Sequence, residues 1–209
     1  MSPVRGRGRR PGGPDTRGQI LDAARESFAR DGFGGTTIRG VAAEAGVDPS
    51  LVHHYFGSKD DLFLAALSIE VDPRQMVPQV FADGVAGAGE RLLRTMLTVW
   101  DDPAARLPLV ALVRSSLGAE TPHTLLQDGI VRMVLTPLRA VLPPAEADRR
   151  AQLVATQVLG LIVGRYLLEL EPLRSFSTDE LVAWVGPTIQ RYLDGPLDKP
   201  GSAGAQFNA

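Results

Sequence analysis

The 209-residue sequence predicts an all-α fold, and three observations support this prediction. Apolar residues recur every three or four positions along most of the chain, which is the period of an amphipathic helix. Residues that cap helix N-termini, above all Ser, Thr and Asp, stand just before several of these segments. No segment alternates apolar and polar residues over several positions, as a half-buried strand would. We therefore expect successive helices and no sheet.

Composition bounds the kind of protein. Hydrophobic residues make up 44% and charged residues 22% of the chain, which is ordinary for a globular protein with a buried core. Cysteine is absent, so a disulfide framework, a thiolate zinc site and a thiol nucleophile are excluded, and a cytoplasmic location is expected. The most apolar stretch, residues 158–164, is far shorter than the roughly 20 residues that cross a bilayer, so no membrane partner is expected.

Charge is unevenly distributed along the chain. Residues 1–59 hold nine Lys and Arg residues and six acids, a balance of +3, and since the whole chain carries −2 the remainder carries −5. A basic N-terminal region on an acidic body favours a DNA contact confined to one end. Residues 1–14 contain Gly, Pro and Arg but no acid and are predicted to form a disordered basic arm. This arm is either a solubilising tail or an additional DNA contact.

The N-terminal part is predicted to contain short, well-capped helices. Thr16 and Gln19 have capping-box spacing at the start of the first helix. Asp48 and Pro49 have the order of an N-cap followed by proline at the first helical position. Caps and apolar spacing together predict helices over residues 16–31, from 36 or 37 to 45, 50–55 and 58–70.

The segment Thr36 to Phe56 has the pattern of a helix-turn-helix. Two short helices that cross steeply need a small residue at the crossing, and Ala42 supplies one. The turn favours a residue that tolerates positive φ, and Gly46 lies four positions later. Val47 and Val52 are spaced to anchor the second helix on an apolar core. We therefore expect two crossed helices here.

Residues 16–67 resemble the DNA-binding domain of the TetR family of bacterial regulators. The resemblance rests on two segments in the right order and spacing, ILDAARESFARDGFGGTTIRGVAAEAGV and LVHHYFGSKDDLF. His53 departs from the pattern, because the family usually has Tyr there. The resemblance implies an all-α protein with an N-terminal three-helix helix-turn-helix domain and a C-terminal helical domain for ligand binding and dimerisation. We place them at residues 15–60 and 61–195, with a flexible tail at 196–209.

The third helix is expected to enter the major groove of DNA with its N-terminal half at the bases. None of its leading residues offers the paired hydrogen bonds by which Arg reads guanine or Asn reads adenine. Reading is therefore expected from apolar contact of Leu51 with thymine methyls, from weaker polar contacts and from DNA shape. The base-contact candidates are Arg39, Pro49, Ser50, Leu51, His53 and His54. By resemblance, Thr37, Tyr55 and Lys59 contact phosphates. Adjacent histidines diverge by about 100° on a helix, so no metal site is expected.

Beyond residue 71 the pattern predicts helices near 74–83, 88–100, 103–117, 122–141, 146–170 and 178–194. The 146–170 helix is apolar over more than one stripe, which fits a central core helix or a dimer contact equally well. By resemblance, the last two helices form a four-helix bundle with a second copy of the chain, giving a homodimer. The interface candidates are Val158, Gly160, Gly164, Leu167, Trp184, Ile189 and Tyr192.

The helices between residues 74 and 141 are expected to enclose a cavity for an unidentified small-molecule effector, mostly apolar with a few polar groups. The candidate wall residues are Met76, Phe81, Met96, Trp100, Arg114, His123, Met133 and Arg165. Each of them is also compatible with an ordinary core or helix-end position.

No catalytic or cofactor-binding motif occurs, so the chain is not expected to be an enzyme or to hold a cofactor. The resemblance implies a sequence-specific DNA-binding regulator, a repressor released from a palindromic operator by a ligand that moves the helix over residues 58–70. A ligand-independent or activating regulator and an architectural DNA-binding protein are the alternatives. The large apolar C-terminal half disfavours the last, because coating DNA requires no cavity.

Overall fold

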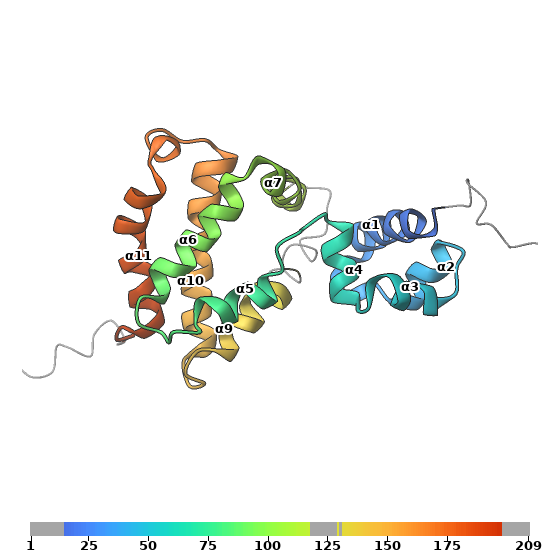
Figure 1. Ribbon diagram of the computed structural model, residues 1–209, viewed down its shortest axis with the longest axis horizontal. Coiled ribbons are helices and arrows are strands. Elements are labelled where there is room, and N and C mark those ends of the chain that lie inside the picture. The colour runs from blue at the N-terminus through green and yellow to red at the C-terminus, as the bar shows by residue number, and fades with distance from the viewer. Residues whose placement is uncertain (1–14, 118–128, 130, 198–209) are drawn as a thin grey trace, which may run out of the picture.

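The computed structural model describes residues 15–117, 129 and 131–197. All regular secondary structure in these residues is helical, so the predicted fold class is confirmed. Figure 1 shows a small N-terminal body of α1–α4 and a larger body that contains α5 to α11, with α4 on the side of the small body that faces the large one. Within the described ranges, no helix is both long enough and apolar enough to span a membrane.

The small body begins with three helices, α1 (Thr16–Gly35), α2 (Ile38–Glu44) and α3 (Pro49–Phe56). Asp15, not Thr16, caps α1, because its side chain accepts a hydrogen bond from the Gly18 N–H at 3.0 Å. α1 continues past its predicted end through a kink at Gly32, whose backbone is not helical. Asp48 caps α3 with Pro49 in its first turn, as the sequence predicts.

The turn between α2 and α3 has the predicted chemistry. Gly46 has φ of +67°, a backbone conformation that L residues with a side chain rarely adopt. Ala42 and Val52 are buried and Val47 packs against them from the turn. Small and branched apolar side chains at these positions let the two helices cross closely.

α4 (Lys59–Ala66) completes the core of the small body. The Phe63 ring meets the Phe28 and Phe33 rings edge-on, with centroids 5.0 and 5.2 Å apart. Ser58 caps the helix and accepts a hydrogen bond from the Asp61 N–H. The prediction of a helix through residue 70 is wrong, because α4 stops at Ala66 and the chain then crosses to the large body without helical structure.

The large body follows the predicted order of helices, with two changes. The helix predicted over 146–170 stays α-helical only to Ile162 and then widens into a π-helical turn. Of the helix predicted over 122–141, residues 122–128 and 130 lie outside the described residues, and the described remainder is a π-helical turn followed by a short α-helix. The elements are α5 (Pro73–Val80), α6 (Ala88–Asp101), α7 (Pro103–Leu117), η1 (Val131–Leu135), α9 (Thr136–Ala140), α10 (Ala147–Ile162), η2 (Val163–Leu167), η3 (Leu173–Ser175) and α11 (Thr178–Asp194).

α6 and α11 pack closely because glycine lies at their crossing. A Cβ added at Gly89 would lie 2.6 Å from the backbone nitrogen of Gln190, so no other residue fits without moving the helices apart. The Gly89 N–H also donates to the Gln190 side chain at 2.8 Å. This contact positions α6, which forms part of the cavity wall.

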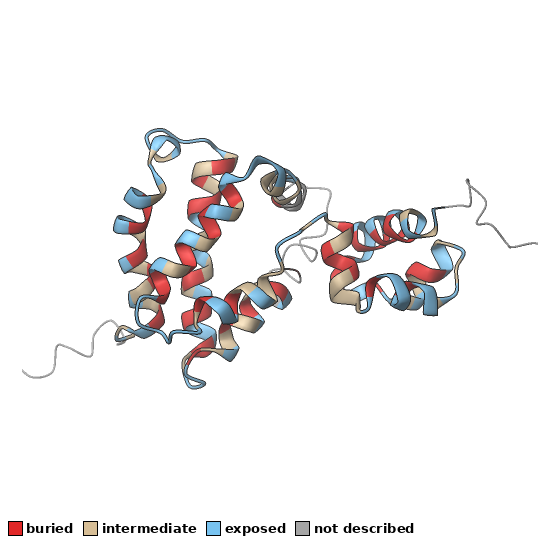
Figure 2. Cartoon of the chain, in the orientation of Figure 1, coloured by how far each residue is buried: buried red, intermediate tan, exposed pale blue. Residues whose placement is uncertain are grey.

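The buried residues form two clusters, one in each body, and both are visible as red segments in Figure 2. Met133 is an exception to this division. It lies on η1, which follows α7 in the chain, yet it belongs to the N-terminal cluster that contains Phe63 and Phe28. The described segment η1 therefore joins the core of the small body directly to the large one.

Candidate DNA-binding surface and ligand cavity

α3 has one buried and one exposed face. Val52 and Phe56 fix the helix to the core, while the opposite face carries Leu51 and Tyr55 with exposed fractions of 37% and 42%. Ser50, His53 and His54 are also exposed, and Pro49 is half-buried. The structure thus places the predicted base-contact residues of α3 on its outer face or leading turn.

Two polar side chains of this face are already held by hydrogen bonds. The Ser50 hydroxyl donates to the Asp48 carboxylate at 2.6 Å, and the Ser50 backbone N–H donates to the same carboxylate. Together these two hydrogen bonds hold the pKa of Asp48 below its usual range. The His53 Nδ1 lies 2.9 Å from the carbonyl oxygen of Gly57 at the end of the helix. Both side chains therefore keep defined positions before any DNA contact.

The predicted phosphate contacts surround α3. Thr37 caps α2 and its hydroxyl accepts a hydrogen bond from the Gly40 N–H at 3.0 Å. Arg39, a predicted base contact, is exposed one residue into α2. The Lys59 ammonium lies 4.4 Å from the centroid of the Phe33 ring, an attraction between a cation and the π face, so a phosphate contact would require this side chain to swing outward.

Arg17 is a surface cation that sequence reasoning did not single out. It is exposed on the first turn of α1 and its guanidinium lies 5.2 Å from the centroid of the Phe56 ring, at the end of α3. Its position early in α1 carries no motif, so only the packing of α1 on α3 brings it to this surface. Among the described residues, no group of three or more His, Cys, Asp or Glu side chains lies together in a way that could hold a metal ion.

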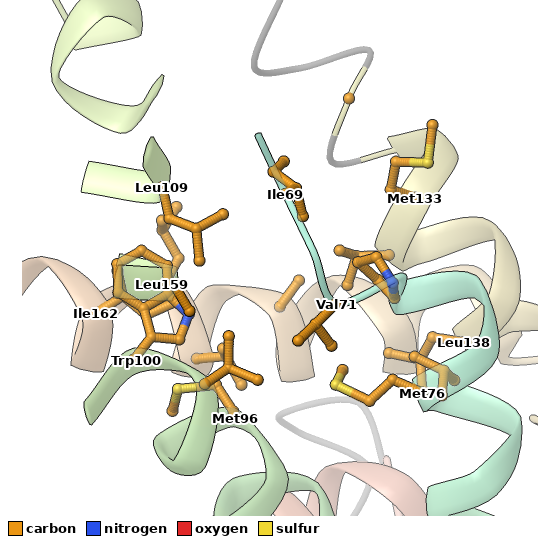
Figure 3. Close-up of a pocket in the computed structure, with 18 of the residues that line it drawn as sticks. Ile69, Val71, Met76, Met96, Trp100, Leu109, Met133, Leu138, Leu159 and Ile162 are labelled. Atoms are coloured by element: carbon orange, nitrogen blue, oxygen red, sulfur yellow. The ribbon is translucent and has the colours of Figure 1, made fainter. Parts of the chain in front are cut away.

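The large body contains a cavity of about 230 Å³. Figure 3 shows its wall, to which Met76 of α5, Met96 and Trp100 of α6 and Met133 of η1 contribute. These four residues were predicted from the sequence. The remaining wall comes from α4 and the linker after it, from α7, α9 and α10, from Gly129, and from further residues of α5, α6 and η1.

Three other predicted wall residues do not line the cavity, and a fourth lies outside the described residues. Phe81 packs against the core away from the cavity, and Arg114 is exposed. Arg165 faces a separate polar recess, where it donates to the carbonyl oxygens of Leu173 and Phe176. A buried cation needs such acceptors, and among the described lining residues of the cavity Glu70 is the single side chain that could pair with one. His123 is the residue outside the described part of the chain.

Two side chains belong to both the cavity wall and the core of the small body. Phe63 and Met133 line the cavity and also pack in the N-terminal cluster. A molecule in the cavity would therefore touch atoms on which the position of α1 and α4 depends.

Ion pairs hold the same junction on its polar side. Arg74 of α5 bonds to Asp72 at 2.7 Å and also pairs with Asp60 and Asp61 at the start of α4. Arg132 of η1 pairs with Asp60 at 2.7 Å, and its guanidinium lies 5.5 Å from the Phe33 centroid. Hydrogen bonds from Ser58 and Arg74 lower the pKa of the Asp61 carboxyl. We call Asp60, Asp61, Arg74 and Arg132 the junction cluster.

The predicted dimer residues differ in exposure. Trp184 on α11 is 57% exposed, and the neighbouring ring of Phe176 meets it edge-on at 4.9 Å. Gly160 on α10 is exposed, with nothing within 4 Å of the position of a Cβ. Both are available to a second chain. Val158, Leu167 and Tyr192 are half-buried against the C-terminal core.

Two residues are wrongly predicted as interface residues. Ile189 is fully buried within its own chain, so it has no surface to offer. Gly164 does allow a close approach, but the approaching group is the Leu173 side chain, 2.8 Å from the position of a Cβ. The chain folds back at η3, so Leu173 of the same chain covers Gly164.

The crossed helices α2 and α3, joined to an all-helical body with an internal cavity, define the class of helix-turn-helix transcription regulators. Residues 20–66 match the family model described as "Bacterial regulatory proteins, tetR family". Residues 86–193, more than half of the chain, match the model described as "Tetracyclin repressor-like, C-terminal domain". The protein belongs to the TetR family, a class of DNA-binding transcriptional repressors, as the sequence resemblance implies.

Individual relatives agree with this assignment. A TetR-family regulator from Streptomyces coelicolor A3 is 39% identical, covers 89% of this chain and 98% of its own, and superposes with a TM-score of 0.55. The HTH-type transcriptional regulator BetI of Agrobacterium fabrum is 27% identical over 90% of this chain and 94% of its own length. BetI of Brucella anthropi is 44% identical over 54 residues, but this match spans only 28% of the Brucella protein and 26% of this chain.

Proposed function

We propose that the protein is a homodimeric repressor that binds a palindromic operator through α3 and releases it when a small molecule enters the cavity. The observation that carries this proposal is the double role of Phe63 and Met133, which lie in the cavity wall and in the core beneath the DNA-binding helices. An architectural DNA-binding protein would need no such connection.

The DNA contact is proposed to combine weak base reading with contacts to the backbone. Leu51 offers an apolar surface to thymine methyl groups, and His54 and Arg39 offer polar contacts beside it. Thr37, Tyr55, Lys59 and Arg17 are the proposed phosphate contacts. Because the exposed α3 residues lack a strong reader of guanine or adenine, much of the specificity is assigned to DNA shape.

Dimerisation is proposed because one α3 helix reads too few base pairs for a specific site. The exposed Trp184 of α11 and the exposed Gly160 of α10 provide a surface for a second chain. A two-fold axis through that surface would present two α3 helices to successive major grooves, about 34 Å apart.

Release is proposed to follow from movement of α4. A ligand that displaces Phe63 or Met133 shifts α4 against α5 and η1, which the junction cluster connects. The distance between the two α3 helices then no longer matches the grooves. By linkage, such a ligand weakens DNA binding by the same factor by which DNA weakens ligand binding.

Footprinting on the DNA upstream of the protein's own gene tests the proposal. We expect a protected palindrome and, in gel-shift titrations, at least about 1000-fold preference over a scrambled fragment of equal length. Equal affinity for both fragments would point to an architectural role and contradict the proposal. The His54→Ala, Leu51→Ala double variant serves as a folded control with a damaged reading face.

A further inference from the structure

We infer that the effector of the cavity is an uncharged, predominantly apolar molecule that presents one hydrogen-bond acceptor to the indole N–H of Trp100. This inference rests on the proposed function, since it takes the cavity as the effector site. It adds the chemical class of the ligand, which the fold alone does not specify.

Where the structure describes it, the wall of the cavity has almost no polar groups. Among the described lining residues, Glu70 is the single ionisable side chain, and it is exposed, in the linker after α4. Deeper parts of the wall are aliphatic, thioether and aromatic groups, as the labelled residues of Figure 3 illustrate. A charged ligand that enters fully would therefore lose its hydration without gaining an ionic partner among the described lining residues.

Charges close to the wall are already engaged elsewhere. Asp72 and Arg74 flank the lining residue Pro73, but they pair with one another at 2.7 Å, and Arg74 also pairs with Asp60 and Asp61 of α4. Arg165 is held by two backbone carbonyl oxygens in the polar recess, with Tyr166 packed on Trp100 at 5.4 Å between the recess and the cavity. Burial of an unpaired charge is far more unfavourable than burial of apolar surface is favourable. An ionic effector is thus excluded from the interior.

Trp100 provides the exception to the apolar wall. It is buried in the wall, and Figure 3 draws its indole with the nitrogen on the side that faces the other labelled residues. No described residue accepts a hydrogen bond from its Nε1, and this nitrogen is not among the fully buried side-chain atoms that lack a partner, so it keeps accessible surface in a residue that lines the cavity. Indole N–H groups in apolar surroundings usually have an acceptor. A carbonyl or ether oxygen on the ligand would supply that acceptor.

Methionines make the wall adaptable. Met76, Met96 and Met133 contribute three flexible, polarisable side chains from three different elements. Thioether groups pack well against aromatic rings and adjust to irregular shapes. An aromatic or polycyclic skeleton therefore suits this wall better than a hydrogen-bonding one.

A matched pair of fluorescent probes tests the charge requirement. N-phenyl-1-naphthylamine is uncharged, and 8-anilino-1-naphthalenesulfonate has the same rings with an added sulfonate. We expect the uncharged probe to bind the full-length protein at least tenfold more tightly, with increased emission. Displacement by decan-1-ol is likewise expected at a tenfold lower concentration than displacement by decanoate or decyltrimethylammonium. Equal or tighter binding of either ion would overturn the inference.

Neighbouring alanines locate the bound probe. Ala105 lines the cavity, whereas Ala104 is exposed and does not. We expect Ala105→Phe to weaken binding of N-phenyl-1-naphthylamine at least tenfold and Ala104→Phe to leave it unchanged. If both variants bind as the wild type does, the probe lies elsewhere and the inference fails. Should Ala105→Phe not fold, the smaller change Ala105→Leu is used with Ala104→Leu as its control, and the same outcomes support or overturn the inference.

The hydrogen bond is tested with a second pair, 2-acetylnaphthalene and 2-ethylnaphthalene, which differ in one carbonyl. We expect Trp100→Phe to reduce the preference for the ketone over the hydrocarbon about fivefold, the effect of one neutral hydrogen bond. An unchanged preference would remove Trp100 from the inference. Operator binding of the wild type is measured in parallel. If the probes do not bind as expected but the operator is still protected, only the inferred ligand class is refuted. If the operator is not protected, the proposed repressor function is refuted.

Discussion

The outer face of α3 and the wall of the cavity differ in how they present polar groups. On α3 the hydroxyl of Ser50 and the ring of His53 are already bonded to Asp48 and Gly57, so the surface is ordered before DNA arrives. In the cavity nearly every lining side chain is apolar, and three of them are methionines. One region is suited to a fixed partner of regular geometry, and the other to a compact molecule whose shape the wall can follow.

Phe63 of α4 lies both in the cavity wall and in the core that supports α3, and the largest predicted effect lies there. Phe63→Ala should lower the free energy of unfolding by about 3–5 kcal/mol, because it empties the centre of the three-phenylalanine contact. Chemical denaturation followed by circular dichroism measures this change. Leu107→Ala, at a largely exposed position, is the control and should change stability little. A loss below about 1 kcal/mol for Phe63→Ala would mean that the packing of Phe63 does not stabilise the core that supports α3.

Lys59→Ala tests the phosphate side of the α3 surface. We expect operator affinity to fall roughly tenfold at 0.1 M salt and the slope of log K against log salt to decrease by about one, equally for all DNA sequences. Gel-shift titration at several salt concentrations measures both. Arg30→Ala, whose guanidinium is held by Asp31 and Glu44, is the control. A loss restricted to one operator variant would assign Lys59 to base reading instead.

Leu51→Ala tests base reading on the same surface. Its effect should be smaller, about 1 kcal/mol, and confined to operators with thymine at the contacted position. Affinity for a set of single-base operator variants measures this, with the salt slope expected to stay as in the wild type. If the loss is uniform across the set, Leu51 contributes to docking and not to reading.

The smallest effect is expected at the polar side of the junction. Hydrogen bonds from Arg74 lower the pKa of the Asp72 carboxyl, so its stabilising contribution is present above the pKa of the unfolded chain and is lost as pH falls through the folded pKa. Asp72→Asn retains a helix cap but removes the charge. It should destabilise the protein by about 0.5–1 kcal/mol at pH 7, and the difference should begin to shrink near pH 4 and vanish once the pH lies below the folded pKa of Asp72.

The control for this measurement is Asp83→Asn, at an exposed position in the segment between α5 and α6. Its stability should match that of the wild type at both pH values. If Asp72→Asn destabilises equally at pH 7 and at pH 3, the carboxylate charge is not the cause.

Local signals predicted the small body well. The helix caps at Asp48 and Ser58 and the turn at Gly46 depend on residues a few positions apart, so the sequence alone locates them. The cavity was predicted less well, with Met76, Met96, Trp100 and Met133 placed in its wall but Phe81, Arg114 and Arg165 outside it. A helical period shows that a residue is buried, but not whether it faces a cavity or a neighbouring helix.

The sequence by itself determined the all-α class, the order of the helices and the helix-turn-helix, because periodicity, capping and turn chemistry act within a few residues. Only the tertiary structure decided that η1 packs in the N-terminal core, that Arg74 and Arg132 meet the start of α4, and that Leu173 covers Gly164. These contacts join segments far apart in the chain, and each depends on the packing of whole helices. The connection between cavity and DNA-binding surface, on which the proposed regulation rests, is a property of that packing.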